Sequence, residues 1–321
     1  MATGKPVVGV DVGGTNVRAA VFDPATWRWL APPRRRALAE GAGQVVDLIA
    51  QTVRQAVDDA GLPLEAIGGV GVGFPGIVDP GAGRSLYAVN LPEWKGGPVR
   101  AWLEARLGLP VQVENDVRAG GLAEFRLGAG KGRRSMVYVS VGTGIGGALF
   151  VDGWRWLGAT FQAGEIGHMV LDPSEAAPLC RCGQRGDAEA YLSGRAIEEA
   201  ARRSLGLGLS AGEVLEAGRN PDHPAARLRD QVITYLALLL SNLQKLLDPE
   251  VFVVGGGMGL HPAYPVEEAA RKAWGQVAPE TKQGPQVCRA ALGSHSGLYG
   301  AALLAAGWEE RASAPSPGVP C

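Results

Sequence analysis

The chain has 321 residues, of which 46% are hydrophobic, so it is long enough and apolar enough to form two domains of ordinary size. Its 31 lysine and arginine residues nearly balance its 32 aspartate and glutamate residues. This balance excludes the strong positive field that would attract a nucleic acid or an anionic membrane surface, and we expect neither as a partner.

The first part of the chain predicts a β-hairpin followed by helices and strands. Two β-rich runs meet at Gly13-Gly14, which is typical of a hairpin turn, and apolar residues spaced four apart predict a helix that ends before Gly61. In chain order, the predicted elements are strands over residues 7–12 and 17–22, a helix carrying Val45, Ile49, Val53 and Val57, a buried strand in IGGVGVGFPG, a short helix that begins near Pro98, and a strand in PVQVEND.

The second part of the chain repeats this opening arrangement. SMVYVSVGTGIGGALFVDG places a Gly-Thr-Gly turn between two apolar β-runs, and the Ser210-x-x-Glu213 pattern predicts the capped start of a helix. The other predicted elements are helices over residues 188–204 and 227–247, strands in VFVVGGG and PQVCRA, and a closing helix over residues 297–306. The sequence therefore predicts an α/β protein of two similar halves, each opening on a glycine turn between strands.

Several features predict a cytoplasmic protein. The N-terminus lacks the residue order of a signal peptide, and the most apolar helical run, VITYLALLLSNLQKLL, is too short and too polar to span a bilayer. Only two of the four cysteines lie close together, so we expect reduced thiols, with Cys288 buried on a strand. Residues 311–321 show no apolar period and are predicted to form a disordered tail.

The two glycine turns are candidate phosphate-binding sites. Residues 71–76 and 142–147 match G-x-G-x-x-G, but neither match opens a helix, so neither is a dinucleotide fingerprint. Each turn alone could simply connect two strands, yet backbone N–H groups in such turns can hold phosphate oxygens. Because two related turns open the two halves, we interpret both as phosphate-binding, with Asp11 as a possible Mg²⁺ ligand. The candidate residues are Asp11, Gly13, Gly14, Thr15, Gly142, Thr143 and Gly144.

Seven blocks of the sequence together resemble the ROK family of sugar kinases, which belongs to the hexokinase/actin-like ATPase superfamily. The blocks are DVGGTNVR, GFPGIVD, VENDV, SVGTGIGGAL, AGEIGHM, CRCGQRGDAEAYLSG and LDPEVFVVGGGMG. They occur in the family's order over roughly residues 6–305. Nothing precedes the first block, where the family's repressors carry a DNA-binding domain, so we expect an enzyme rather than a regulator.

The resemblance implies a two-domain actin-like ATPase fold of the ribonuclease H type, with the active site in the cleft between the domains. The small domain would comprise residues 1–115 and about 298–310, and the large domain residues 116–297. The glycine turns would bind the phosphates of ATP with Mg²⁺, and Gly255, Gly256 and Gly257 would line the adenosine pocket. Family members are commonly dimers or tetramers, so we expect a homo-oligomer.

Phosphoryl transfer to a sugar hydroxyl needs positioning, charge neutralisation and a carboxylate that accepts the hydroxyl proton. The resemblance assigns this general base to Asp116, although an aspartate there could also be the N-cap of the following helix. It further implies that carboxylate, amide and imidazole groups pair with the sugar hydroxyls. The implied sugar contacts are Asn90, Asn115, Asp116, Glu165, His168 and Glu189.

The segment CRCGQRGDAE departs from the family's metal loop, in which a histidine and three cysteines bind zinc. Asp187 stands where the third cysteine is expected, so the implied ligands are His168, Cys180, Cys182 and Asp187. A carboxylate is an accepted zinc ligand, but this set would bind zinc more weakly than three thiolates and a histidine. Two alternatives stay open: a loop held by packing with only occasional metal, and a strained Cys180–Cys182 disulfide.

We therefore expect an ATP-dependent hexose kinase that phosphorylates glucose at the 6-hydroxyl, similar to the glucokinase-like members of the family. Fructose, mannose, allose or an N-acetylhexosamine would use the same side chains, and polyphosphate could replace ATP. Two alternatives from other classes are a non-catalytic sugar sensor and a filament- or chaperone-type ATPase. The retained Asp116 argues against the first, and the set of Glu165, His168 and Glu189 argues against the second.

Overall fold

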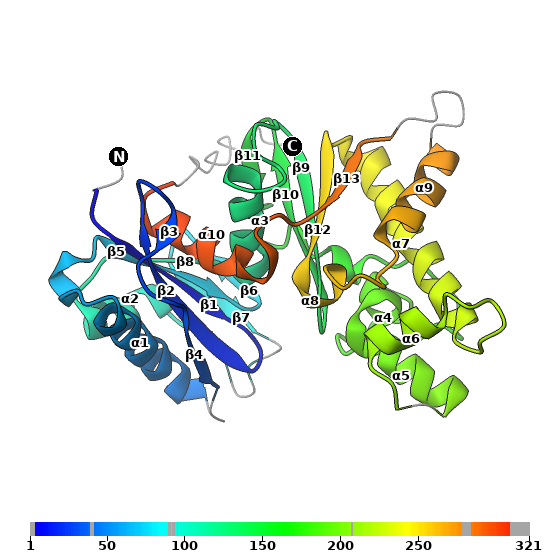
Figure 1. Ribbon diagram of the computed structural model, residues 1–321, viewed down its shortest axis with the longest axis horizontal. Coiled ribbons are helices and arrows are strands. Elements are labelled where there is room, and N and C mark those ends of the chain that lie inside the picture. The colour runs from blue at the N-terminus through cyan, green and yellow to red at the C-terminus, as the bar shows by residue number, and fades with distance from the viewer. Residues whose placement is uncertain are drawn as a thin grey trace, which may run out of the picture. The chain divides into compact units, whose positions relative to one another are not determined.

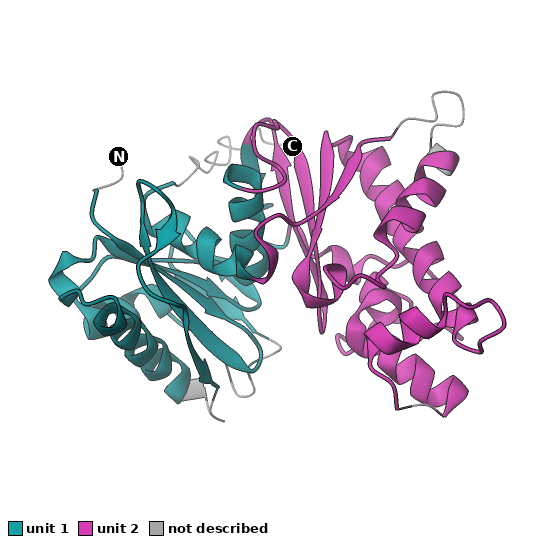
Figure 2. Cartoon of the chain, viewed as in Figure 1, with its two compact units in different colours: residues 1–127, 154–162, 295–321 teal, residues 128–153, 163–294 magenta. Residues whose placement is uncertain are grey.

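The computed structural model (Figure 1) describes residues 4–38, 42–88, 91, 94, 96–206, 208–277 and 284–308. The chain forms two compact units (Figure 2). Unit 1 comprises residues 1–127, 154–162 and 295–321, and unit 2 comprises residues 128–153 and 163–294. Where the sequence places a domain boundary at residue 115, the helix that follows this residue and the segment 154–162 are grouped with unit 1.

The sheet of unit 1 has the strand order β3-β2-β1-β5-β8, with β4 paired to β2. β1 and β2 form the predicted antiparallel hairpin, whereas β5 lies parallel to both β1 and β8. The elements are β1 (Val7–Val12), β2 (Asn16–Asp23), β3 (Arg28–Trp29), β4 (Arg34–Ala37), α1 (Ala42–Asp59), β5 (Gly69–Phe74), β6 (Ile77–Asp79), β7 (Arg84–Tyr87), α2 (Val99–Leu107), β8 (Val111–Asn115), α3 (Asp116–Arg126) and α10 (Ser296–Ala305).

Helices cover both faces of this sheet, as β1 illustrates. Alternate residues of a strand point to opposite faces. Val8 and Val10 join a core that includes α1 and α2, whereas Val7 packs with Leu298 and Ala302 of α10. Burial on both faces explains why this strand carries no polar side chain before Asp11 instead of alternating between polar and apolar residues.

The second sheet has the strand order β11-β10-β9-β12-β13. It repeats the same pattern, because β9 and β10 form an antiparallel hairpin and β12 lies parallel to β9 and β13. The elements in this part of the chain are β9 (Met136–Val141), β10 (Ile145–Val151), β11 (Trp154–Trp156), α4 (Ala188–Leu192), α5 (Gly194–Leu205), α6 (Ala211–Ala217), α7 (Ala226–Leu247), β12 (Val251–Gly255), α8 (Gly256–Gly259), α9 (Val266–Val277) and β13 (Gln286–Arg289).

Most predicted elements are confirmed, including the capping box in which Ser210 begins α6. The single helix predicted over residues 188–204 is wrong. Ser193 has extended backbone angles, ends α4 and starts α5, where its hydroxyl accepts a hydrogen bond from the N–H of Ala196. Cys288 is half-buried on β13 rather than fully buried. The structure also adds α9 and the β6–β7 strand pair, which the sequence patterns do not predict.

Two other expectations concern the C-terminal tail and membrane-spanning helices. The tail predicted over residues 311–321 lies outside the described residues. Of the helices that the structure describes, none combines the length and the apolar character needed to cross a bilayer.

α10 approaches its neighbours so closely that glycine is required at the contacts. A Cβ atom at Gly71 of β5 would lie 1.7 Å from the carbonyl oxygen of Ala301, and one at Gly300 would lie 1.7 Å from the carbonyl oxygen of Ala119 in α3. These distances are far below van der Waals contact, so a side chain at either position would force the backbones apart. The contact fixes α3, the helix that carries the predicted base.

We expect Gly300→Ala to destabilise the protein by about 1–3 kcal/mol, because the new methyl group overpacks the contact between α3 and α10. The matched control is Gly275→Ala, at an exposed position of α9 where a Cβ atom would meet no described atom within 4 Å. The control should stabilise the helix by about 0.5–1 kcal/mol. Urea unfolding measures both effects, and a Gly300→Ala midpoint at or above that of the unsubstituted chain would contradict the close packing.

Candidate functional site

The first glycine turn joins β1 to β2. The N–H of Gly13 donates to the carbonyl of Asn16 across the turn at 2.9 Å. A Cβ atom at Gly13 would meet its nearest described atom only at 3.6 Å, which is ordinary contact. The turn therefore has room for a side chain that the sequence does not place there, and its bare backbone is open to a ligand. Gly14 and Thr15 are exposed at its tip.

The carboxylate of Asp11 lies beside this turn. It pairs with the guanidinium of Arg18, its partner in the β1–β2 register, at 2.5 Å through Oδ2. A Cβ atom at Gly297 would lie 2.8 Å from Oδ1, so the missing side chain of Gly297 leaves room for the carboxylate. Carboxylate oxygens suit Mg²⁺, which binds them directly or through water, and Asp11 fits that chemistry.

β8 ends at Asn115 and α3 begins at Asp116. The N-cap is Asn115, because its Oδ1 accepts a hydrogen bond from the N–H of Arg118 at 2.9 Å. The capping role that the sequence leaves open for Asp116 therefore belongs to its neighbour. Oδ1 of Asp116 instead accepts from Nδ2 of Asn115 at 3.1 Å and from the N–H of Val117 at 3.0 Å. These bonds orient the carboxylate at a helix N-terminus, where negative charge is stabilised.

A buried ion cluster lies directly before these two residues. Glu114 has no exposed side-chain surface, and its two oxygens lie 2.8 Å from Nε of Arg118 and 2.8 Å from Nη1 of Arg155. The oxygen nearer Arg118 also accepts the N–H of Asn115 at 2.6 Å. Because a buried charge is stable only when it is paired, this cluster fixes the junction between β8 and α3.

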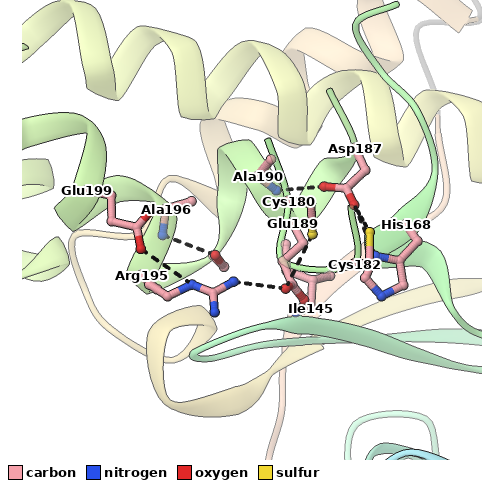
Figure 3. A network of polar contacts seen from close by, with 11 residues as sticks. Ile145, His168, Cys180, Cys182, Asp187, Glu189, Ala190, Arg195, Ala196 and Glu199 are labelled. Atoms are coloured by element: carbon pink, nitrogen blue, oxygen red, sulfur yellow. Dashed lines mark hydrogen bonds and ion pairs between the residues drawn. The ribbon is translucent and has the colours of Figure 1, made fainter. Parts of the chain in front are cut away.

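Glu189 of α4 contacts the second glycine turn (Figure 3). Its Oε2 accepts the N–H of Ile145 at 2.8 Å, and its Oε1 lies 3.2 Å from Nη2 of Arg195. A Cβ atom at Gly144 would lie 2.6 Å from Oε2, so the close approach of this carboxylate requires glycine. A Cβ atom at Gly142, by contrast, would meet no atom within 4 Å in the described part of the chain. Exposed Thr143 lies between the two glycines.

The three glycines predicted to line an adenosine pocket also differ in whether a side chain would fit at their positions. A Cβ atom at Gly255 would lie 2.3 Å from the hydroxyl oxygen of Tyr138. Gly256 has a positive φ of 80° and would bring a Cβ atom to 2.4 Å from the carbonyl oxygen of Val141. Packing therefore explains these two glycines. Gly257 meets no described atom within 4 Å and leaves bare backbone for a ligand.

The predicted sugar contacts fall into two sets. Asn115 and Asp116 belong to unit 1, and Glu165, His168 and Glu189 belong to unit 2. Glu165 is half-buried and precedes a short 3₁₀ turn (Ile166–His168), and its carbonyl accepts the N–H of His168 at 3.1 Å.

Asn90 lies outside the described residues.

The four predicted metal ligands lie together in unit 2. The ligand atoms of His168, Cys180, Cys182 and Asp187 all lie within 4.8 Å of one another. Oδ2 of Asp187 is 3.0 Å from Nδ1 of His168 and 3.4 Å from Sγ of Cys182. Tetrahedral zinc separates its ligand atoms by about 3.5 Å, so the donor types fit zinc and the spacing fits after a small contraction. Both cysteines are free thiols, so the disulfide alternative is wrong.

The titration behaviour of the cluster follows from its hydrogen bonds and burial. The hydrogen bond to Asp187 raises the pKa of His168 against the effect of burial, and the charge of Glu189 adds to the rise. Burial acts to raise the pKa of Asp187, but hydrogen bonds from His168 and the two cysteines outweigh it, so this pKa is lowered. Burial raises the pKa of the Cys180 thiol. Near neutral pH, Asp187 is therefore a carboxylate and Cys180 a neutral thiol.

Three charged residues near these sites are absent from the sequence prediction. Glu114 and Arg155 lie far apart in the chain, and no local pattern relates them. Arg195 is the second residue of α5 and forms an i,i+4 pair with Glu199, which could have marked it only as a surface residue. The contact between Arg195 and Glu189 depends on the break between α4 and α5, so it could not be predicted from one continuous helix.

Comparisons with known proteins agree with this arrangement. The model of the ROK family matches residues 7–307. A ROK hexokinase from Thermus thermophilus has 35% identity and a TM-score of 0.77, with 93% of this chain and 97% of that chain covered. A ROK family glucokinase from Streptomyces griseus, in complex with glucose and AMPPNP, has 32% identity and a TM-score of 0.79, with 93% and 98% covered. An N-acetyl-D-glucosamine kinase from Photobacterium profundum has 33% identity, with 92% of this chain and 98% of that relative covered.

We expect Glu114→Gln to destabilise the protein by about 3–5 kcal/mol, because it leaves two buried guanidinium groups without their counter-charge. The matched control is Asp47→Asn, which breaks the exposed pair with Arg106 and should cost less than about 1 kcal/mol. Urea unfolding compares the two variants. Equal and small losses would show that Glu114 does not fix the start of α3.

Proposed function

This chain belongs to the ROK family, and we propose that it is an ATP-dependent hexose kinase that phosphorylates the 6-hydroxyl of glucose. The observation that carries the proposal is the oriented carboxylate of Asp116 at the start of α3, beside the fixed amide of Asn115. The glucokinase and hexokinase relatives support glucose as the acceptor. The N-acetyl-D-glucosamine kinase makes an N-acetylhexosamine the nearest alternative.

In the proposed reaction, Asp116 accepts the proton of the attacking hydroxyl. Its hydrogen bonds with Asn115 and Val117 hold the carboxylate in one orientation, which is the main requirement for a general base in phosphoryl transfer. Asn115 is itself held, because its Nδ2 donates to the carbonyl of Gly76 at 2.9 Å. An amide fixed in this way can pair with a neighbouring sugar hydroxyl.

The donor phosphates are proposed to bind the two glycine turns. The exposed threonines and the bare backbone at Gly13 and Gly142 support this assignment, because a phosphate oxygen can approach both. Asp11 would hold Mg²⁺, with Arg18 fixing its carboxylate. When bound, Mg²⁺ neutralises negative charge on the phosphates. Gly257 would lie against the adenosine of ATP.

The sugar is proposed to contact Glu165, His168 and Glu189 as well as Asn115. Nδ1 of His168 faces Asp187, which leaves Nε2 as the ring nitrogen for a sugar hydroxyl. When bound, zinc would be structural and held by His168, Cys180, Cys182 and Asp187. By family resemblance we also propose a cytoplasmic homo-oligomer.

The test is ADP release from Mg²⁺–ATP with glucose, mannose, fructose, allose, N-acetylglucosamine and N-acetylmannosamine, measured for the unsubstituted chain and for Asp116→Asn. We expect turnover to concentrate on glucose and kcat to fall by about 10²-fold or more in the variant, because the general base is lost. Polyphosphate in place of ATP tests the donor.

Asp58→Asn is the control for that experiment, because Asp58 is an exposed carboxylate on α1. It should leave kcat unchanged. Turnover on N-acetylglucosamine alone would replace glucose as the acceptor, and unchanged kcat in Asp116→Asn would remove Asp116 as the base. Sugar binding without any sugar-dependent turnover would identify a sugar sensor.

We expect His168→Ala to lose bound metal and to raise the KM for the sugar together, because one ring nitrogen faces the metal ligands and the other is assigned to the sugar. Metal content by mass spectrometry and KM by the ADP assay measure the two effects. An unchanged KM with lost metal would separate the two roles and assign His168 to the metal loop alone.

A further inference from the structure

Asp187 accepts hydrogen bonds through both oxygens, although its side chain has no exposed surface (Figure 3). Oδ1 accepts the N–H of Ala190 at 2.9 Å and so caps α4. Oδ2 lies 3.0 Å from Nδ1 of His168 and 3.4 Å from Sγ of Cys182. One carboxylate thus joins the start of a helix to the loop that carries the cysteines.

The capped helix reaches the second glycine turn. α4 begins directly after Asp187, and its second residue is Glu189, whose Oε2 accepts the N–H of Ile145 at 2.8 Å. Arg195 holds the other oxygen of Glu189 at 3.2 Å. A shift at the cap would therefore move the carboxylate that binds the turn after Gly144.

We propose that Asp187 holds the cysteine loop and α4 in place without a metal ion, so that Glu189 stays on the second glycine turn whether or not a metal is bound. The two oxygens have different partners: Oδ1 caps α4 through the N–H of Ala190, while Oδ2 faces the ligand atoms of His168 and Cys182. The inference rests on contacts within unit 2 and does not depend on the proposed kinase activity.

A cysteine at this position could not act in the same way. Sulfur is a weak hydrogen-bond acceptor, and cysteine is not among the residues preferred at N-caps, whereas aspartate is. With cysteine, the loop and the helix start would be ordered mainly through the metal. With aspartate, hydrogen bonds from His168, Cys182 and Ala190 already order them.

The experiment compares the full chain and Asp187→Cys, each metal-free after chelation and again after addition of Zn²⁺, with metal content measured by mass spectrometry. Hydrogen exchange of the peptide that contains Ile145 is the main readout, because that N–H bonds to Glu189. In the unsubstituted chain, exchange should be the same with and without Zn²⁺. In metal-free Asp187→Cys it should be faster by about fivefold or more, the factor expected from losing a helix cap, and Zn²⁺ should restore it.

Two further variants make the comparison specific. Ser210→Ala removes the N-cap of α6 in the same unit, so it should lower the melting temperature without making Ile145 exchange depend on Zn²⁺. Asp187→Asn keeps a capping oxygen but can turn an amide donor toward His168 and Cys182. It should leave Ile145 protected while the peptide with residues 180–185 exchanges faster.

Two outcomes would overturn the proposal. In the first, the unsubstituted chain loses protection at Ile145 on chelation and regains it with Zn²⁺, which would mean that the metal orders the loop. In the second, metal-free Asp187→Cys is as protected as the unsubstituted chain. If Asp187→Cys folds only with Zn²⁺, the proposal is supported. If it never folds, unchanged loop exchange in Asp187→Asn would overturn the proposal, and faster exchange would support it.

Discussion

A buried carboxylate must have charged or hydrogen-bonding partners, and this constraint decides how the candidate site residues of each unit are held. Glu114, Glu124 and Asp187 have no exposed surface, and each is satisfied by donors from a distant part of the chain. Two of them lie one or two residues before candidate site residues: Asn115 and Asp116 follow Glu114, and Glu189 lies two residues after Asp187. The pairing that makes burial possible therefore also fixes the position of the next side chains.

The parts of the fold that the sequence predicts correctly are those whose signal is local. Both glycine hairpins, the buried strands and the capping box of α6 depend on residues within a few positions of one another. The break between α4 and α5 is also local, but Ser193 can be read either as a helix-interior residue or as an N-cap. Apart from Gly194, most residues on either side of it are good helix formers, so the pattern favours one helix. In the structure, Ser193 has extended backbone angles and caps α5, so the segment forms two helices.

Less of the candidate site than of the fold could be predicted from the sequence. The metal ligands could be predicted because the segment resembles the family's metal loop, and the structure brings all four together. Arg155 could not be predicted as the partner of Glu114, because the two are brought together only by tertiary structure. The glycines could be located but not explained. Among the described residues, a Cβ atom at Gly142 or Gly257 would meet nothing within 4 Å, whereas one at Gly144 or Gly255 would press on Glu189 or Tyr138. The sequence alone does not distinguish these two reasons for a glycine.

Asp187 stands where the resemblance expects a thiolate, and it still belongs to a group of four side chains that could hold a metal ion. A thiolate binds zinc more strongly than a carboxylate, so the aspartate weakens the affinity of the loop for zinc. The same aspartate adds a helix cap and a second acceptor, which a thiolate supplies poorly. In this chain a bound metal would reinforce a loop that is already ordered. His168 is held with and without a metal, because its contact with Asp187 fixes the imidazole even before any metal binds. The direction of its second nitrogen, Nε2, is fixed with it.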